Sequence, residues 1–88
     1  MPAYHILMKF EVINVNAYSG YKSDERPISF RFQGKDYKVI EIVDRWCEGS
    51  VESKKPCMDY FKVKAEDSEE YILRYNRLFD KWSILVND

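Results

Sequence analysis

The sequence has 88 residues, enough for one small domain, so residues 1–88 are expected to share a single hydrophobic core. Fourteen basic and fifteen acidic residues leave a net charge of −1, which excludes the overall basic excess of most nucleic-acid-binding domains but not a local basic face. No stretch approaches the roughly 18 apolar residues of a membrane-spanning helix, and the first residues do not form a signal peptide. We therefore expect a cytoplasmic protein.

The first predicted strand runs from Tyr4 to Val15. Its odd positions include His5, Lys9 and Glu11, whereas its even positions are apolar or aromatic: Tyr4, Ile6, Met8, Phe10 and Val12. This alternation is typical of a strand with one buried face, so we expect the even positions to be buried. The polar composition of residues 16–26 predicts a loop after this strand.

A β-hairpin is predicted next, over residues 27–46. Ile28, Phe30 and Phe32 alternate with polar residues on its first arm, and the segment Gly34-Lys35-Asp36 supplies the turn. On the second arm the apolar phase shifts by one residue between Val39 and Ile40. Either the strand is buried on both faces there, or a β-bulge resets the phase. We favour a bulge or a strong bend.

The second half of the chain contains a polar loop over residues 47–56, a strand over 58–65 and a turn over 66–69. The last third fits two periods. With period two, residues 71–75 and 82–86 form a closing hairpin; with period 3.6, residues 71–82 form a helix that starts at a capping box. The abundance of β-forming residues favours the hairpin.

The predicted fold is all-β: a small antiparallel meander, a curled sheet, or an SH3-like, partly open barrel of five or six strands. The alternative is an α+β fold with a C-terminal helix. The core is predicted to contain at least one of Ile40 and Ile42, together with eight residues that share the apolar phase of their strands: Phe30, Phe32, Tyr37, Val39, Phe61, Val63, Leu73 and Trp82.

The order of the aromatic residues along the chain is similar to that of a known family. The pattern Pro27-x-x-Phe30-x-Phe32-x-Gly34, a tryptophan at position 46, and the closing pair Tyr71-x-Leu73 and Trp82-x-Ile84 resemble a family of small bacterial all-β domains of uncharacterised function. The match covers residues 26–86. The resemblance implies a hairpin in the last third. Genes of such domains can lie beside genes of translesion-repair polymerases in some bacteria, which implies a link to DNA repair.

The residues that could act as nucleophiles, bases or acids do not form a catalytic pattern. His5 is the only histidine, and no nucleophile stands in a motif with it, so we expect no enzyme activity, no cofactor and no metal. The acidic cluster of Glu66, Asp67, Glu69 and Glu70 is expected to be a solvated turn.

Two cysteines, Cys47 and Cys57, flank the polar loop between the predicted strands. Their spacing is not that of a zinc knuckle. In a reducing cytoplasm we predict two independent thiols. The alternative is a disulfide that joins adjacent strands and closes the loop.

One pattern points to binding. Four cations lie on or near the polar face of the central hairpin, and two more share one face of a later strand: Arg26, Arg31, Lys35 and Lys38, then Lys62 and Lys64. A sheet with basic residues and exposed tyrosines can follow the backbone of a single-stranded nucleic acid and stack its bases. Interspersed acidic residues fit an ordinary solvated surface instead. We therefore predict a non-enzymatic interaction or accessory module that binds a protein partner or a second copy. The alternative is a single-stranded nucleic-acid-binding accessory domain that uses the first four cations.

Overall fold

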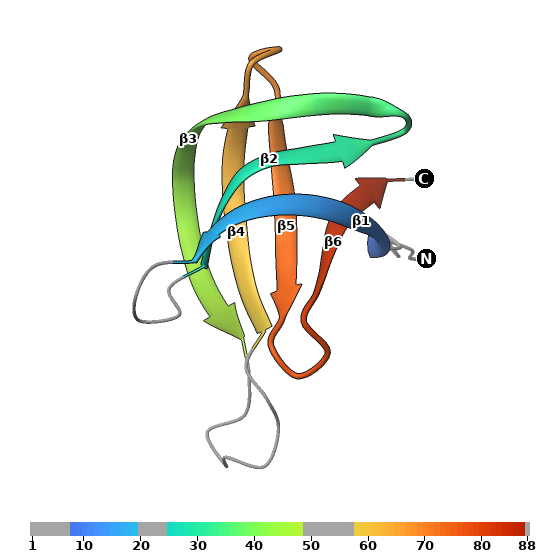
Figure 1. The fold of residues 1–88 in the computed structure, drawn as a ribbon, viewed down its shortest axis with the longest axis vertical. Helices are drawn as coiled ribbons and strands as arrows, with labels where there is room; N and C mark the ends of the chain where they lie inside the picture. The colour runs from blue at the N-terminus through green and yellow to red at the C-terminus, as the bar shows by residue number, and fades with distance from the viewer. Residues whose placement is uncertain (1–7, 20–24, 49–57, 88) are drawn as a thin grey trace, which may run out of the picture.

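The structure is a computed structural model that describes residues 8–19, 25–48 and 58–87. Within these ranges the chain forms six antiparallel strands and no helix, and the strands close into a barrel in the order β1 to β6 (Figure 1). The strands are β1 (Met8–Ser19), β2 (Glu25–Phe32), β3 (Lys35–Glu48), β4 (Met58–Ala65), β5 (Glu70–Asn76) and β6 (Lys81–Asn87). The all-β prediction is confirmed, and the alternative with a C-terminal helix is wrong because β5 and β6 form a hairpin.

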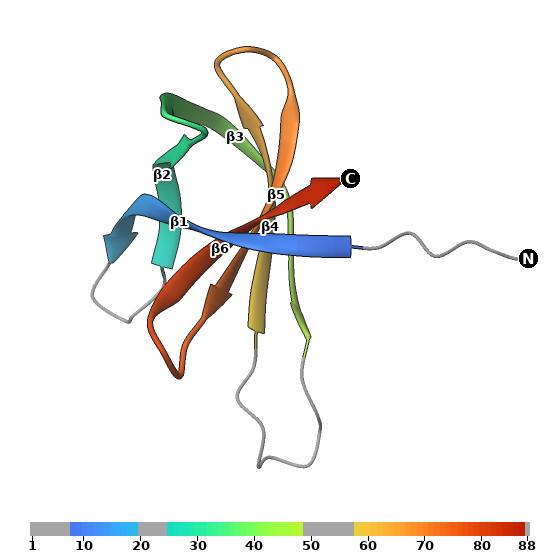
Figure 2. The same ribbon diagram turned by 90° about the vertical axis from the view of Figure 1, so that its right-hand side faces the viewer.

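Two long strands each pair with two different partners. β1 pairs with β6 over residues 8–13 and with β2 over residues 14–19. β3 pairs with β2 near its start and with β4 over the rest of its length. Figure 2 shows β1 crossing β6 and continuing toward β2. The two long strands therefore join the β2–β3 hairpin to the β4–β5–β6 meander.

The phase shift in β3 is a β-bulge, as predicted. Val39 pairs with Ala65 and Glu41 pairs with Lys64, which leaves Ile40 without a partner on β4. Ile40 is 63% exposed as a result. Ile42 returns to the inner side and packs against the core. A bulge adds local bend and twist, which a strand needs when it changes partners around a barrel.

A further register shift in β3 leaves Val43 without a partner on β4, and another bulge lies between β1 and β2, where one prediction is wrong. Asn16 pairs with Ser29, whereas Ala17 pairs with Pro27, so Ile28 has no partner on β1. Ile28 is 46% exposed, and Pro27 is buried in its place. Ile28 therefore does not share the buried face of Phe30, because the bulge shifts the alternation by one residue.

The turn of the β2–β3 hairpin lies one residue earlier than predicted. It is a two-residue connection, Gln33-Gly34, flanked by the pair Phe32 and Lys35. Both turn residues have positive φ, 53° and 75°. This is the backbone of a type I′ turn, whose twist matches that of the flanking strands.

The buried face of β1 is the odd one, contrary to prediction. Ile13, Val15 and Ala17 pack against the core, whereas Val12 is 65% exposed. The strand carries apolar side chains in both phases, so alternation alone does not identify its inner face. β1 also extends to Ser19, past the predicted end, while the first residues of the predicted strand lie outside the described ranges.

The core fills the inside of the barrel, as predicted. All eight expected residues are buried or pack against the buried cluster, whose members are Phe30, Phe61, Val63, Ala65, Leu73, Tyr75, Trp82 and Ile84. Phe61, Val63, Leu73 and Ile84 are the largest fully buried side chains. Most of the core therefore comes from the β4–β5–β6 meander.

Replacing Phe61 with alanine tests this arrangement. Phe61 is 0% exposed, and we expect Phe61→Ala to lower the free energy of unfolding by about 3–5 kcal/mol, because it removes a large buried ring and leaves a cavity. Urea unfolding measures the loss. Ile40→Ala, at an exposed bulge position, is the control and should change stability by less than about 0.5 kcal/mol. Equal losses for the two variants would contradict the assignment of inner and outer faces.

Candidate binding surface

The predicted basic face of the β2–β3 hairpin is interrupted by acidic residues and divided between two sides of the sheet. All four cations are exposed: Arg26, Arg31, Lys35 and Lys38. Arg31 Nη1 lies 3.2 Å from Asp36 Oδ1 on the opposite strand. Lys35 is on the same side of β3 as Tyr37, and its ammonium lies 5.8 Å from the centre of that ring. The four side chains therefore do not form one continuous basic stripe.

Polar groups of both signs surround this hairpin. The Lys38 amide donates a hydrogen bond to the Glu66 carboxylate at 3.4 Å. A hollow of about 310 Å³ borders the same face, with polar lining residues Asn14, Asn16, Ser29, Arg31 and Asp36. Asn16 Nδ2 donates to Ser29 Oγ at 3.0 Å. These contacts are those of a solvated, mixed-charge surface, and the assignment of the four cations to nucleic acid stays a prediction.

The state of Cys47 contradicts the prediction of two independent thiols. It is disulfide-bonded, and Cys57, which lies outside the described residues, is the only other cysteine of the chain. Two independent thiols are therefore ruled out. The β3–β4 register places Cys47 opposite Asp59, two residues after Cys57 in sequence. Antiparallel pairing thus brings the two ends of the loop together, a proximity that the ten-residue spacing does not reveal.

The acidic turn has a structural role. Asp67 accepts hydrogen bonds from the Tyr71 hydroxyl at 2.6 Å and from the Glu69 amide at 3.0 Å. The bond from Tyr71 holds the pKa of Asp67 below its ordinary value of 3.8. Burial, and then the bond to Asp67, raise the pKa of Tyr71. No group of three or more potential metal ligands occurs within the part of the chain that the structure describes, and His5 lies outside it.

The contact between Tyr71 and Asp67 predicts a pH dependence. Because folding lowers the pKa of Asp67, its ionised form stabilises the fold above its unfolded pKa of 3.8, and this stabilisation is lost as pH falls through the folded pKa. The stability difference between the natural protein and Tyr71→Phe should be constant from about pH 5 to 7 and should shrink below about pH 4. Urea unfolding at each pH measures it. A difference that stays constant or grows in acid would contradict this coupling.

A row of side chains crosses the outer face of the meander. The register pairs each member with the next, so five strands contribute one residue each: Trp46, Tyr60, Arg74, Ser83 and Val12. We call these five residues the outer row. Their sequence neighbours Phe61, Leu73 and Trp82 are buried in the core. Since side chains alternate along a strand, the outer row points away from the core, although Ser83 is only 8% exposed.

Contacts between aromatic rings, and between a ring and an arginine, fix the side chains of the outer row. Trp46 and Tyr60 are stacked, with ring centres 5.3 Å apart and planes at 1°. Phe10, from β1, meets Tyr60 edge-on at 6.1 Å. The guanidinium carbon of Arg74 lies 3.9 Å from the centre of the Phe10 ring. Aromatic pairs and cation–π contacts of this kind hold side chains in defined orientations before any ligand arrives.

One end of the outer row borders a groove of about 350 Å³. Its lining residues are Val12, Arg74, Asn76, Phe79, Lys81 and Ser83. Val12 and Phe79 are each 65% exposed. Phe79 belongs to the β5–β6 turn, residues 77–80, where Asn76 Oδ1 accepts hydrogen bonds from the amides of Leu78 and Phe79 at 3.0 and 3.2 Å. Two large, exposed apolar side chains therefore line one groove.

The same turn is tied to the rest of the barrel. Arg77 donates two hydrogen bonds, at 2.8 and 3.1 Å, to the carboxylate of Asp59 on β4, which is buried. The Tyr75 hydroxyl donates to Asp80 Oδ1 at 2.6 Å. Both bonds anchor the turn that presents Phe79.

Loss of the Arg77 guanidinium should weaken the fold. We expect Arg77→Met to lower the free energy of unfolding by about 1–3 kcal/mol, because it removes the paired cation of a buried carboxylate. Thermal or urea unfolding measures the loss. Adding Asp59→Asn to Arg77→Met removes the uncompensated charge and should recover part of it. Strict additivity of the two substitutions would contradict direct coupling.

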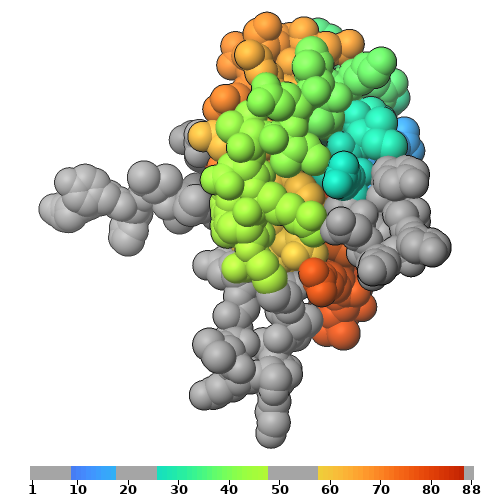
Figure 3. All heavy atoms as spheres, turned by 90° about the vertical axis from the view of Figure 1, so that its left-hand side faces the viewer, coloured from blue at the N-terminus to red at the C-terminus, as the bar shows by residue number. Residues whose placement is uncertain are grey.

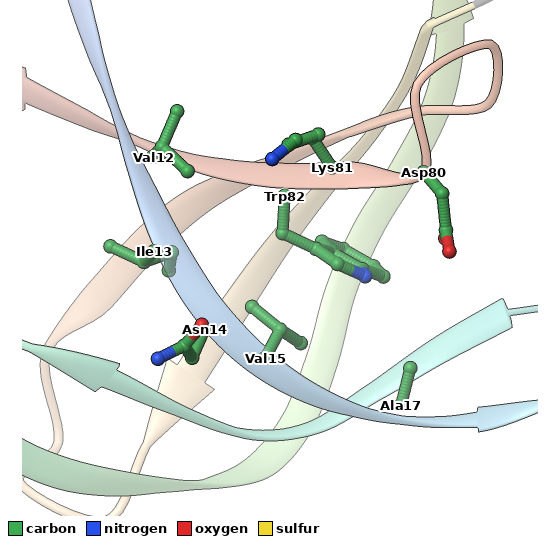
Figure 4. A pocket seen from close by; sticks show the side chains of 8 residues that line it. All are labelled: Val12, Ile13, Asn14, Val15, Ala17, Asp80, Lys81 and Trp82. Carbon is green, nitrogen blue, oxygen red and sulfur yellow. The ribbon is translucent and has the colours of Figure 1, made fainter.

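A second cavity, of about 450 Å³, lies where β1 separates from β6. Its lining residues are Val12, Ile13, Asn14, Val15, Ala17, Asp80, Lys81 and Trp82. Figure 4 shows Trp82 and Val15 extending into this region, with Asn14 and Asp80 on opposite sides of the view. The cavity shares Val12 and Lys81 with the groove, but Asp80 places a carboxylate in its wall. The cavity therefore has both a cation and a carboxylate in its lining, and it does not favour a ligand of either charge.

Sequence reasoning missed the outer row. The available signal was an aromatic residue in the polar phase of a strand: Tyr60 precedes the buried Phe61, so alternation points it outward. The pairing of Trp46 with Tyr60 depends on the bulges of β3, which alternation does not position.

No family model, curated protein or solved structure matches this chain. The resemblance to the family of small bacterial all-β domains therefore stays a prediction. Across the described residues, no helix is long and apolar enough to cross a membrane.

Proposed function

We propose that this chain is a non-enzymatic binding domain that engages a protein partner through the outer row and Phe79. The observation that supports this is the exposure of apolar and aromatic side chains together on one outer face, with Trp46 40% and Val12 65% exposed. Exposed apolar patches with a polar rim mark interaction surfaces. Aromatic residues and arginine are also the types that dominate the energetic centres of protein interfaces.

The mode of binding follows from the closed barrel. Each of the six described strands pairs on both sides for part of its length. A partner that adds a strand to a free sheet edge is therefore disfavoured, because closure leaves little unpaired edge. Recognition proceeds instead through side chains on the outer face.

A single-stranded nucleic acid is the second candidate ligand, and the Trp46–Tyr60 stack with Arg74 nearby supports it, because bases stack on such platforms. The net charge of −1 and the pairing of Arg31 with Asp36 weigh against it. The link to DNA repair stays a prediction for the same reason. The cytoplasmic location also stays a prediction, and the disulfide at Cys47 argues against it, since disulfides persist mainly in oxidising compartments.

Two exposed aliphatic residues on different faces give a matched test. Val12 is 65% exposed and lies in the outer row, whereas Ile40 is 63% exposed on β3, the strand that forms much of the surface in Figure 3. Peptides selected from a random phage-displayed library provide the probe, and fluorescence anisotropy measures their affinity. Val12→Lys should weaken binding by at least about tenfold, and Ile40→Lys should leave it within about twofold. Thermal melts establish that both variants fold.

Three results would overturn the proposal. Equal loss of affinity in both variants would place binding elsewhere. Failure to select any peptide would remove the protein-binding role. Binding of a labelled single-stranded oligonucleotide that is lost in Val12→Lys, without peptide binding, would establish the second candidate in its place.

A further inference from the structure

The groove beside the outer row is lined by two large apolar side chains. Val12 comes from β1 and Phe79 from the β5–β6 turn, and both are largely exposed. A volume of about 350 Å³ is at the lower end of the roughly 300–1,000 Å³ of small-molecule sites. The groove is therefore suited to one large side chain and not to an extended apolar surface.

Most polar groups of the groove are hydrogen-bond donors, and the Ser83 hydroxyl can both donate and accept. Arg74 and Lys81 contribute a guanidinium and an ammonium group, and neither forms an ion pair within the described ranges. Asn76 Oδ1 already accepts two backbone amides, which leaves its Nδ2 group to donate. No aspartate or glutamate lines the groove. Such a donor set attracts an anion, and hydrogen bonds from cations to a carboxylate are about twice as strong as neutral ones.

The Arg74 guanidinium is oriented in advance. It stacks on the Phe10 ring at 3.9 Å, which covers one of its faces and leaves its N–H edges for other partners. Because the stack already restricts the side chain, less rotamer entropy is lost when a ligand binds. Lysine has the same charge but neither the planar fork nor this stacking geometry.

We propose that the protein partner presents to this groove an apolar side chain followed directly by an aspartate or glutamate. This inference rests on the proposed function and specifies its ligand. The apolar side chain packs between Val12 and Phe79, and the carboxylate binds Arg74 and Lys81. Two cations fit one carboxylate better than a polyanion, because a chain of phosphates needs a longer row of cations than the two that line this groove.

Short synthetic peptides test the preference. The probes carry a central Phe-Glu or the matched Phe-Gln and have blocked termini, so that the Glu side chain is the only carboxylate of the first peptide and the second has none. NMR titration of the ¹⁵N-labelled protein measures their affinity and maps their site. The natural protein should bind the Phe-Glu peptide at least about tenfold more tightly than the Phe-Gln peptide. Arg74→Gln should reduce this ratio several-fold and leave only the contribution of Lys81.

Two further variants distinguish the effect of positive charge from the effect of the planar Arg74 side chain. Arg74→Lys keeps the charge but should lose most of the preference, and it serves as the second variant where Arg74→Gln does not fold. Lys62→Gln removes an outer-face cation that is paired with Glu70 at 3.5 Å and does not line the groove. This control should leave the preference for Phe-Glu unchanged within about twofold.

The outcomes distinguish this inference from the proposed function. Equal affinity for the two peptides, with both lost in Val12→Lys, would overturn the acidic preference while leaving the protein-binding role intact. No binding of either peptide, together with failure of the phage selection, would overturn both. A short oligothymidine that binds at the groove more tightly than either peptide, and is lost in Arg74→Gln, would assign the groove to nucleic acid and overturn the peptide inference.

Discussion

Pairing between β1 and β6 closes the sheet into a barrel and determines which side of every strand becomes the interior. β1 must leave β6 and reach β2, and β3 must pass from β2 to β4, so both long strands change partners. A bulge at Ile40 accompanies the change in β3, and a bulge at Ile28 of β2 lies opposite β1. An inserted residue bends and twists its strand, which lets a small sheet close on itself. Each of these two bulges also leaves an isoleucine at the surface: Ile28, which was expected inside, and Ile40.

Closure also explains why so many apolar residues remain outside. The interior of a small barrel is filled by side chains such as Phe61, Leu73 and Ile84, and it has room for only one apolar phase of each strand. β1 has apolar residues in both phases, so Val12 faces outward when Ile13 and Val15 face inward. Val12 and Trp46 of the outer row are apolar residues of this kind, 65% and 40% exposed. Their exposure costs solubility without adding to the core, which is why a binding role accounts for them better than stability does.

The groove combines an ordered turn with an oriented cation. Arg77 and Asp59 anchor the β5–β6 turn to β4, and the Asn76 side chain bonds to its backbone. Phe79 is thus held beside Val12, with Arg74 on the Phe10 ring close by. These contacts are made within the free protein. A ligand would meet a surface that is already arranged, so most of its interaction energy remains available for affinity.

Local pattern was enough to predict the all-β class, the β4 strand from Met58 to Ala65, the closing hairpin and the eight core residues, because alternation and turn chemistry act over a few neighbouring residues. The phase shift in β3 was also visible, since it involves consecutive apolar residues. The inner face of β1, the exposure of Ile28 and the disulfide at Cys47 depend on which strands pair and in what register. The outer row depends on the same pairings across five strands. These features were decided by contacts between residues far apart in the chain, and no local pattern of side chains specifies such contacts.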